Sequence, residues 1–306
     1  MIERSRIRGI VPPLVTPLNS DRETVNTVAT GQLVERCVAQ GVHGIFVGGT
    51  TGEVWVLDDV QWQRLVAAAV EACHGRVPVF AGVSHAATAG AVARTRLAER
   101  LGADVVVSLP PYYIVSSQAD VVRHYQTIAA ATSLPVVVYQ YPGIAKVSIT
   151  LATYQQLATI PSVLAIKDSQ GDVTEFRRMI NTLRGHGNDL QLLLGSDTLT
   201  DAVVLMGGQG TIPSLANVAG NCLVAAYAAA VAGAWQQSAA MQAQATALTD
   251  IYRVAGEVSV PAVVAGLKCA LGLLGIEAGP TAAPVQPLDN AQAAAVEQIL
   301  ACGGLL

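Results

Sequence analysis

Short apolar runs recur along the chain, and each is followed by a longer stretch in which apolar residues return every three or four positions. The runs lie at residues 9–15, 44–50, 78–84, 104–110, 135–141, 163–169, 191–197 and 207–213. Runs of this length, often bounded by glycine or proline, are typical of β-strands. The stretches between them have the spacing of amphipathic helices, as in Val34, Cys37, Val38 and Gly41. The pattern therefore predicts alternating strands and helices.

Most of these runs are continuously apolar, which is what strands require when both faces of a parallel sheet are covered. About eight strand–helix units in roughly 220 residues fit a (β/α)8 barrel, whereas a doubly wound sheet usually has fewer strands and a glycine-rich phosphate-binding turn. No such glycine motif opens the first unit. We predict an α/β fold, with a TIM barrel in residues 1–225 and a C-terminal helical extension in residues 226–306.

The composition is that of a folded chain, and its charge gives no electrostatic signal for binding of polyanions. Of the 306 residues, 52% are hydrophobic and 13% are charged, and the formal net charge is −4. The longest basic run is the pair Arg177 and Arg178. We therefore expect neither nucleic acid nor an anionic membrane surface as a partner.

Two segments imitate membrane signals. Arg4, Arg6 and Arg8 precede an apolar stretch, but prolines interrupt that stretch, and a buried first strand is the favoured interpretation. Residues 202–249 carry no charged side chain, yet they are rich in alanine rather than leucine or isoleucine. We expect a helix that is buried between layers or subunits rather than one that spans a membrane.

The cysteines and histidines are scattered. Five cysteines include no C-x-x-C pair, which favours a reducing, cytoplasmic location. The histidines form no H-E-x-x-H motif and no cluster with cysteine, so no metal site is expected.

Polar side chains stand at the ends of most predicted strands, where a (β/α)8 barrel carries its catalytic groups. They are Thr50, Thr51, Glu53, Ser84, His85, Tyr112, Tyr113, Tyr139, Lys167, Asp168, Asp197 and Thr211. These groups should converge on one mouth of the barrel. For Ser84 and His85 we favour a cap for a helix beginning near Ala86 over a contact with substrate.

Lys167 is the strongest candidate for chemistry, because it stands inside an apolar strand and the chain has only two other lysines, Lys146 and Lys268. One interpretation is a buried ion pair with Asp168 or a more distant carboxylate. The other is a nucleophile, since burial disfavours the ammonium form and a neutral amine can attack a ketone. The residue types alone leave both open.

An imine on Lys167 would act as an electron sink, so that a neighbouring bond could break, and a proton carrier would have to stand nearby. Tyr139 ends the preceding predicted strand and is well placed for this role. A tyrosine of ordinary pKa needs hydroxyl partners to relay a proton, and Thr50 and Tyr113 are the candidates. The alternatives are an amphipathic core position for Tyr139 and a simple tight turn with a helix cap for residues 48–53.

Four short motifs contain most of these candidate residues. In chain order they are GGTTGE at 48–53, PPYY at 110–113, YQYP at 139–142 and AIKDS at 165–169. Together they resemble the dihydrodipicolinate synthase / N-acetylneuraminate lyase family of class I, Schiff-base aldolases. KCALGLLG at 268–275 and PVQPL at 284–288 are similar to the C-terminal region of that family. The resemblance thus covers nearly the whole chain and implies a TIM barrel.

The resemblance also implies a mechanism. Lys167 would form an imine with pyruvate or another 2-keto acid without any other cofactor, and Tyr139 would shuttle protons, aided by Thr50 and Tyr113. Tyr113 would reach into the site of a neighbouring subunit, so at least a dimer, and commonly a homotetramer built as a dimer of dimers, is expected. The backbone and hydroxyl groups of Thr50 and Thr51, at a helix N-terminus, would hold the carboxylate of the keto acid.

The implied substrate-binding set is completed by three further residues. Gly49 lies beside the two threonines, Ile212 would line the pyruvate pocket, and Asp197 matches an acidic sugar-binding residue of the sialic acid lyases. We expect these to surround the substrate.

Departures from the family pattern bear on the second substrate. Synthases of the lysine pathway carry an arginine after the YxxP tyrosine, whereas this chain has Gly143, Ile144 and Ala145 there, followed by Lys146. Sialic acid lyases place a second acid at Thr198 and prefer serine at Thr50. The YxYP text is most similar to aldolases and dehydratases of 2-keto-3-deoxy sugar acids, which is the favoured assignment.

Four alternatives stay open from the sequence: 4-hydroxy-tetrahydrodipicolinate synthase, N-acetylneuraminate lyase, a keto-deoxy sugar acid dehydratase, and a catalytically idle keto-acid sensor. The sequence does not decide among the lyases, nor does it fix the direction of the reaction or its regulation. The retained set of Lys167, Tyr139, Thr50 and Tyr113 argues against the sensor, since a buried lysine is costly.

Overall fold

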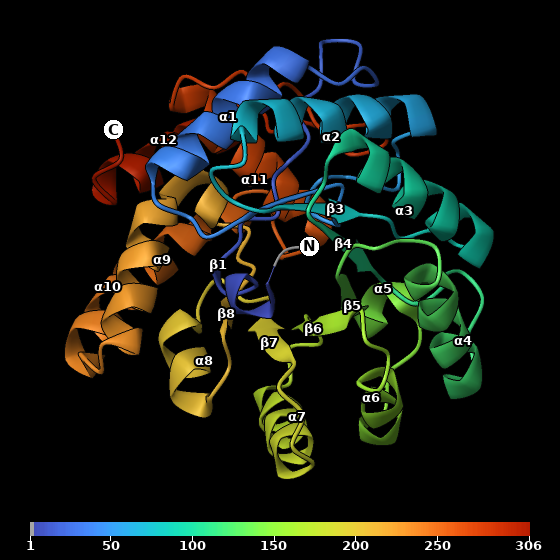
Figure 1. Ribbon diagram of the computed structural model, residues 1–306. Coiled ribbons are helices and arrows are strands. Elements are labelled where there is room, and N and C mark those ends of the chain that lie inside the picture. The colour runs from blue at the N-terminus through green and yellow to red at the C-terminus, as the bar shows by residue number, and fades with distance from the viewer. Residues whose placement is uncertain (1–2) are drawn as a thin grey trace.

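A computed structural model describes residues 3–306, which form an eight-stranded sheet in which every neighbouring pair of strands is parallel (Figure 1). The strands are β1 (Gly9–Ile10), β2 (Ile45–Val47), β3 (Val79–Gly82), β4 (Val105–Ser108), β5 (Val136–Gln140), β6 (Val163–Asp168), β7 (Gln191–Leu194) and β8 (Gly210–Thr211). Each lies inside one of the eight apolar runs.

The sheet closes into a barrel. The order runs β1-β8-β7-β6-β5-β4-β3-β2, and a parallel bridge between Pro13 and Phe46 joins the chain beyond β1 to β2. The (β/α)8 barrel prediction is therefore confirmed. The strands are shorter than the apolar runs, most of all β1, because Pro12 and Pro13 have no N–H for a ladder.

Helices surround the strands (Figure 1). They are α1 (Thr27–Ala39), α2 (Asp59–Cys73), α3 (Thr88–Leu101), α4 (Gln118–Ala129), the short α5 (Pro142–Ala145), α6 (Leu151–Leu157), α7 (Val173–Gly185) and α8 (Thr200–Met206). The expected cap by Ser84 is wrong: its hydroxyl accepts from the Leu109 N–H at 2.9 Å, while α3 begins only at Thr88. Ser84 instead ties β3 to β4.

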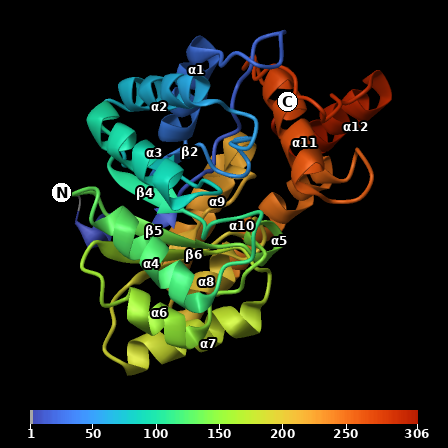
Figure 2. The same ribbon diagram turned by 90° about the vertical axis from the view of Figure 1, so that its right-hand side faces the viewer.

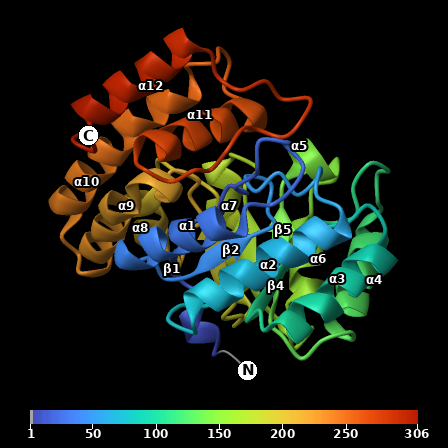
Figure 3. The same ribbon diagram turned by 90° about the horizontal axis from the view of Figure 1, so that it is seen from above.

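The C-terminal region consists of α9 (Ala216–Val231), α10 (Trp235–Leu248), α11 (Val260–Leu273) and α12 (Asn290–Cys302). α10, α11 and α12 lie together on one flank (Figure 3), and α11 lies with α5 on the side away from the N-terminus (Figure 2). Since α5 directly follows β5, this is the carboxyl end of the barrel. Residue 225, where the sequence suggested a boundary, lies within α9.

The uncharged stretch at 202–249 is divided among α8, β8, α9 and α10. α9 has most of its residues buried, in keeping with its alanine-rich text, and packs against α8 and α10. Among the described residues, no helix has the length and apolar character to cross a membrane.

Candidate active site

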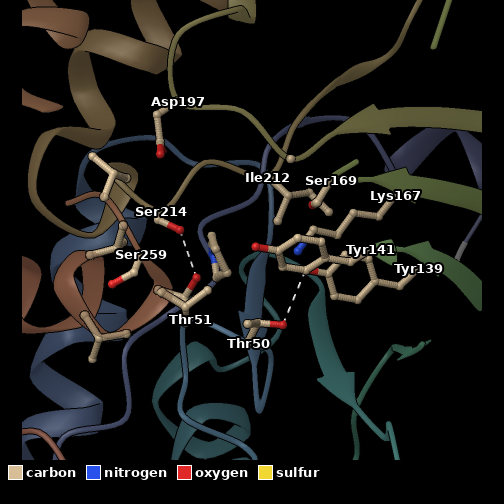
Figure 4. A pocket seen from close by; sticks show the side chains of 16 residues that line it. Thr50, Thr51, Tyr139, Tyr141, Lys167, Ser169, Asp197, Ile212, Ser214 and Ser259 are labelled. Atoms are coloured by element: carbon tan, nitrogen blue, oxygen red, sulfur yellow. Dashed lines mark hydrogen bonds between the residues drawn. The ribbon is translucent and has the colours of Figure 1, made fainter. Parts of the chain in front are cut away.

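A cavity of about 230 Å³ opens at the carboxyl ends of the strands (Figure 4). Its walls come from the ends of six strands, β1, β2, β5, β6, β7 and β8, and from α11 with the residues just before it. The residues that line it are Pro13, Thr50, Thr51, Tyr139, Tyr141, Lys167, Ser169, Gly195, Asp197, Ile212, Ser214, Val258, Ser259, Val260, Val263 and Val264. Residues as far apart in sequence as Pro13 and Val264 therefore meet here.

Lys167 is placed by strand register. It pairs directly with Tyr139 across β5 and β6, and its amine lies 3.9 Å from the centre of the Tyr139 ring and 4.9 Å from that of Phe46. The residue is 4% exposed, and burial lowers the pKa of the amine to about 7, while the charge of Asp197 opposes this shift. Roughly half of the molecules would then hold a neutral amine near pH 7.

The alternative of a buried ion pair is not what the structure contains. Asp168 points to the other side of the strand, where its carboxylate accepts from the Gln170 backbone N–H at 2.8 Å and from the Gln170 side chain at 2.9 Å. Between residues 3 and 306, no carboxylate lies within ion-pair distance of the Lys167 amine. The amine therefore faces two aromatic rings and the cavity.

The Tyr139 hydroxyl lies 3.4 Å from the Thr50 hydroxyl. Tyr139 is buried, and burial raises the pKa of its phenol, opposed by its hydroxyl neighbours Thr50 and Ser169. A neutral phenol at neutral pH can both donate and accept a proton. The expected contact between Tyr139 and Thr50 is present.

Thr51 lies beside Thr50 and shares a hydrogen bond of 2.8 Å with the Ser214 hydroxyl. In the described part of the chain, the backbone N–H groups of Thr50 and Thr51 donate to no protein acceptor. The expected helix N-terminus is absent here, because α2 begins only at Asp59, with Asp58 as its cap. The two N–H groups belong to a turn that opens on the cavity.

Asp197 and Ile212 both line the cavity, as expected. The Asp197 carboxylate accepts from the Leu215 N–H at 2.8 Å, and burial raises its pKa to about 6, against this hydrogen bond. In Figure 4, Asp197, Ser214 and Ser259 lie across the cavity from Lys167 and Tyr139.

Two expected site residues lie outside the cavity wall. A Cβ on Gly49 would come within 2.7 Å of the Phe46 ring, so this glycine makes room for the ring beneath Lys167. Tyr113 has a left-handed backbone, with φ 80°, and is 87% exposed. It contributes nothing to the cavity of its own subunit.

Sequence reasoning missed several wall residues. Tyr141 and Ser169 lie inside the quoted motifs but received no role, although two positions after Tyr139 and Lys167 they lie on the same side of their strands. Ser259 and the valines of α11 carried no signal, because the pattern gave no reason to place that helix over the barrel.

The fold and the site together define a class. An amine with a pKa near 7 at the carboxyl end of a barrel strand suits attack on a carbonyl carbon rather than binding of an anion. Among the described residues, no group of three or more histidine, cysteine or acidic side chains could hold a metal ion. The barrel and the buried amine at its carboxyl end define a (β/α)8 lyase of the class I aldolase type.

The chain belongs to the dihydrodipicolinate synthetase family, whose model matches residues 6–302. It is 35% identical over 300 residues to an uncharacterised DapA-like lyase of Halobacterium salinarum, covering 98% of this chain and 95% of that one. It is 34% identical over 302 residues to the 4-hydroxy-tetrahydrodipicolinate synthase of Phenylobacterium zucineum, covering 98% of each. The resemblance inferred from the motifs is thereby confirmed.

Solved structures agree. YagE of E. coli, a prophage protein of the dihydrodipicolinic acid synthase family in complex with pyruvate, superposes with a TM-score of 0.91 at 26% identity, over 98% of this chain and 99% of that one. Members of the family are lyases that bind a keto acid covalently through a lysine and need no external cofactor.

Proposed function

We propose that this protein cleaves 2-keto-3-deoxy sugar acids to pyruvate and an aldehyde, through an imine on Lys167. The observation that carries the proposal is the chemistry of the cavity wall. Hydroxyl groups and one carboxylate face the cavity, and Lys167 is the single cation among the described residues that line it. A substrate with a second carboxylate would call for an arginine, whereas a polyhydroxylated chain finds partners throughout this wall.

The reaction begins when the neutral Lys167 amine attacks the C2 carbonyl of the keto acid. Loss of water from the carbinolamine gives the protonated imine. The C4 hydroxyl then loses its proton, the C4 aldehyde forms, the C3–C4 bond breaks, and its electron pair moves through C3 and C2 onto the imine nitrogen. Protonation of the resulting enamine at C3 and hydrolysis release pyruvate and restore the lysine.

Tyr139 and Thr50 would move the protons of these steps. The hydroxyl contact of 3.4 Å between them supports a relay, and the phenol lies directly beside the amine. Because burial raises the pKa of Tyr139, the phenol rests protonated, so it carries a proton from one group to another rather than acting as a standing base.

The remaining wall residues would bind the two ends of the substrate. The N–H groups of Thr50 and Thr51, which donate to no acceptor among the described residues, suit the keto-acid carboxylate. Ile212 suits the C3 methylene of the sugar acid, which becomes the methyl group of pyruvate. Asp197, Ser214 and Ser259 suit the hydroxyls of the sugar chain, since a carboxylate and two hydroxyls can accept or donate as needed.

A second copy of the chain would complete the site. Tyr113 is followed by Ile114 and Val115, which are 71% and 70% exposed, and this apolar loop follows β4 on the same face as the cavity. We propose a homodimer, or a dimer of dimers, in which each Tyr113 enters the partner's site. One relative is described as a monomeric dihydrodipicolinate synthase variant, so the assembly of this chain has to be measured.

We also propose a cytoplasmic location, with which the five free cysteines are consistent.

The synthase reaction is the second candidate, because several curated relatives carry that name, including one at 34% identity. Against it, α5 (Pro142–Ala145) contains no cation, and the Lys146 amine donates to the Gly143 carbonyl at 2.9 Å instead of lining the cavity. The arginine expected for the aldehyde partner's carboxylate has no counterpart in the wall.

One experiment separates these functions. The protein is incubated with 2-keto-3-deoxygluconate, and pyruvate is measured by a coupled dehydrogenase; a parallel reaction contains pyruvate and aspartate semialdehyde. Release of pyruvate supports the aldolase. Consumption of the sugar acid without pyruvate would replace it by a dehydratase, and turnover of aspartate semialdehyde alone would replace it by the synthase.

A further inference from the structure

Behind the cavity wall, Glu53 and Lys268 form a fully buried ion pair. Their side chains are 1% and 2% exposed, and the Lys268 amine lies 2.5 Å from one Glu53 carboxylate oxygen. The amine also donates to the Pro280 carbonyl at 2.8 Å, and the other carboxylate oxygen accepts from the Ala282 N–H at 2.8 Å. The turn after β2, α11 and the chain that follows α11 therefore meet at one pair of charges.

Each of these three segments is connected to the active-site cavity. Glu53 ends the turn that carries Thr50 and Thr51, and Lys268 lies one helical turn after Val264, a wall residue on α11. The third segment, residues 278–282, hydrogen-bonds to the chain after β1, where the Leu18 N–H donates to the Ala278 carbonyl at 3.1 Å.

The backbone at Glu53 indicates that this turn is held in place. Glu53 has φ 53°, a left-handed conformation that side-chain-bearing residues rarely adopt and that costs of order 1 kcal/mol or more. A glycine would adopt it without strain. Such a conformation persists when surrounding contacts determine it, and here those contacts are the buried carboxylate's two partners and a 3.1 Å bond from the Glu53 N–H to the Thr50 carbonyl.

A buried ion pair is a poor device for stability alone, because desolvation of the two charges offsets most of their attraction. Such a pair does fix the relative position of the two segments that carry it, because each buried charge is stable only when the opposite charge lies close to it. Glu53 lies three residues after Thr50, and neither Glu53 nor Lys268 lines the cavity.

We infer that Glu53 and Lys268 are positioning residues, which lock α11 to the turn after β2 and so hold Thr50 and Thr51 at the distance from Lys167 that imine formation requires. This inference rests on the proposed imine chemistry of Lys167. The C-terminal region then has two roles: it covers the cavity, and it holds residues of the barrel in position for catalysis.

The test is the rate at which pyruvate and sodium borohydride produce a covalent adduct, followed by intact mass. The variants are Glu53→Gln with Lys268→Met together, which removes both charges and leaves neither one buried alone. We expect the rate at saturating pyruvate to fall by about tenfold or more. The control pair is Glu35→Gln with Arg76→Met, an exposed ion pair of the same 2.5 Å length, for which we expect no change in rate.

A cycle with Thr50→Val separates positioning from general loosening of the fold. If the pair acts through Thr50, its removal in the Thr50→Val background lowers the rate by less than about twofold. The inference would be overturned if the rate loss of the combined variant equalled the product of the losses caused by Thr50→Val and by removal of the pair. It would also be overturned if the charge-free variant reacted as fast as the original protein.

Thermal unfolding shows whether the charge-free variant is folded. If it is not, Glu53→Asp takes its place, because a shorter side chain keeps the charge but cannot reach both partners; an unchanged rate for a folded Glu53→Asp would also overturn the inference. Failure of the unaltered protein to form any adduct would instead refute the proposed function, so the two failures are distinguishable.

Discussion

At the scale of single residues, the chemistry depends on where one amine lies. Lys167 would be an ordinary ammonium on the surface, with a pKa of about 10.4. Between the rings of Tyr139 and Phe46 it loses water, gains no paired carboxylate, and has its pKa lowered to about 7. Burial therefore makes the Lys167 amine nucleophilic, and the register of β5 with β6 places the proton carrier Tyr139 beside it.

Replacement of Lys167 by alanine is expected to abolish the borohydride-trapped pyruvate adduct and to lower lyase activity by at least about a thousandfold, as loss of a covalent nucleophile does. Lys146→Ala is the matched control, because Lys146 is exposed and outside the cavity. Peptide mapping of the trapped protein identifies the modified lysine. An adduct that survives in Lys167→Ala would remove the basis of the assignment.

Imine formation should depend on pH through the Lys167 amine. Because its pKa is lowered to about 7, the neutral form increases as pH rises, and the trapping rate should climb through a midpoint near 7 and then level off. Initial trapping rates at saturating pyruvate between about pH 5.5 and 9 measure this midpoint. A rate still climbing at the upper end would mean that the amine has the ordinary lysine pKa.

Asp197 should serve the sugar chain and not the keto acid. Asp197→Asn is expected to raise the KM for 2-keto-3-deoxygluconate by about tenfold, the value of a hydrogen bond to a charged acceptor. Trapping of pyruvate should be unchanged when it is measured above about pH 8.5, where Lys167 is neutral with or without the nearby charge. Equal effects on both substrates would place Asp197 at the pyruvate end instead.

At the scale of secondary structure elements, sequence patterns predicted the positions of the strands but not the packing of distant helices against the barrel. The eight strands were evident because buried parallel strands must be continuously apolar, and the register of β5 with β6 then brings Tyr139 beside Lys167. The start of α2 was misplaced, since a threonine in a turn and a threonine capping a helix have the same appearance in sequence. The position of α11 over the cavity depends on packing between distant segments, which periodicity does not contain.

The first turn of α11 provides an element-scale test. Ser259 caps this helix by accepting from the Ala262 N–H at 3.3 Å, and it also lines the cavity. Ser259→Ala should cost about 1 kcal/mol of stability, as loss of a cap does, and also raise the KM for the sugar acid. Asp289→Ala, which removes the cap of α12 away from the cavity, should cost a similar stability and leave the KM unchanged. Urea unfolding and steady-state kinetics on both variants check this; a shared KM effect would contradict a substrate contact at Ser259.

At the scale of the whole molecule, the cavity is lined by residues from six strand ends and α11, yet the expected relay member Tyr113 is not among them. A side chain that is 87% exposed and held in a left-handed backbone is costly in an isolated chain. Both features are accounted for if Tyr113 belongs to the site of a second copy. Isologous pairing makes the exchange mutual, so each subunit gives one tyrosine and receives one.

Complementation between two inactive variants tests this exchange. Tyr113→Phe keeps Lys167 but lacks the shared hydroxyl, and Lys167→Ala keeps Tyr113 but lacks the nucleophile, so each should be nearly inactive alone. In a mixed dimer one site receives both groups, and random exchange of subunits should restore about a quarter of the original activity. Static light scattering should give a mass that is a multiple of 31.6 kDa before and after mixing. A mixture that stays inactive although the subunits have exchanged, or an active protein that remains a monomer, would show that Tyr113 does not act across an interface.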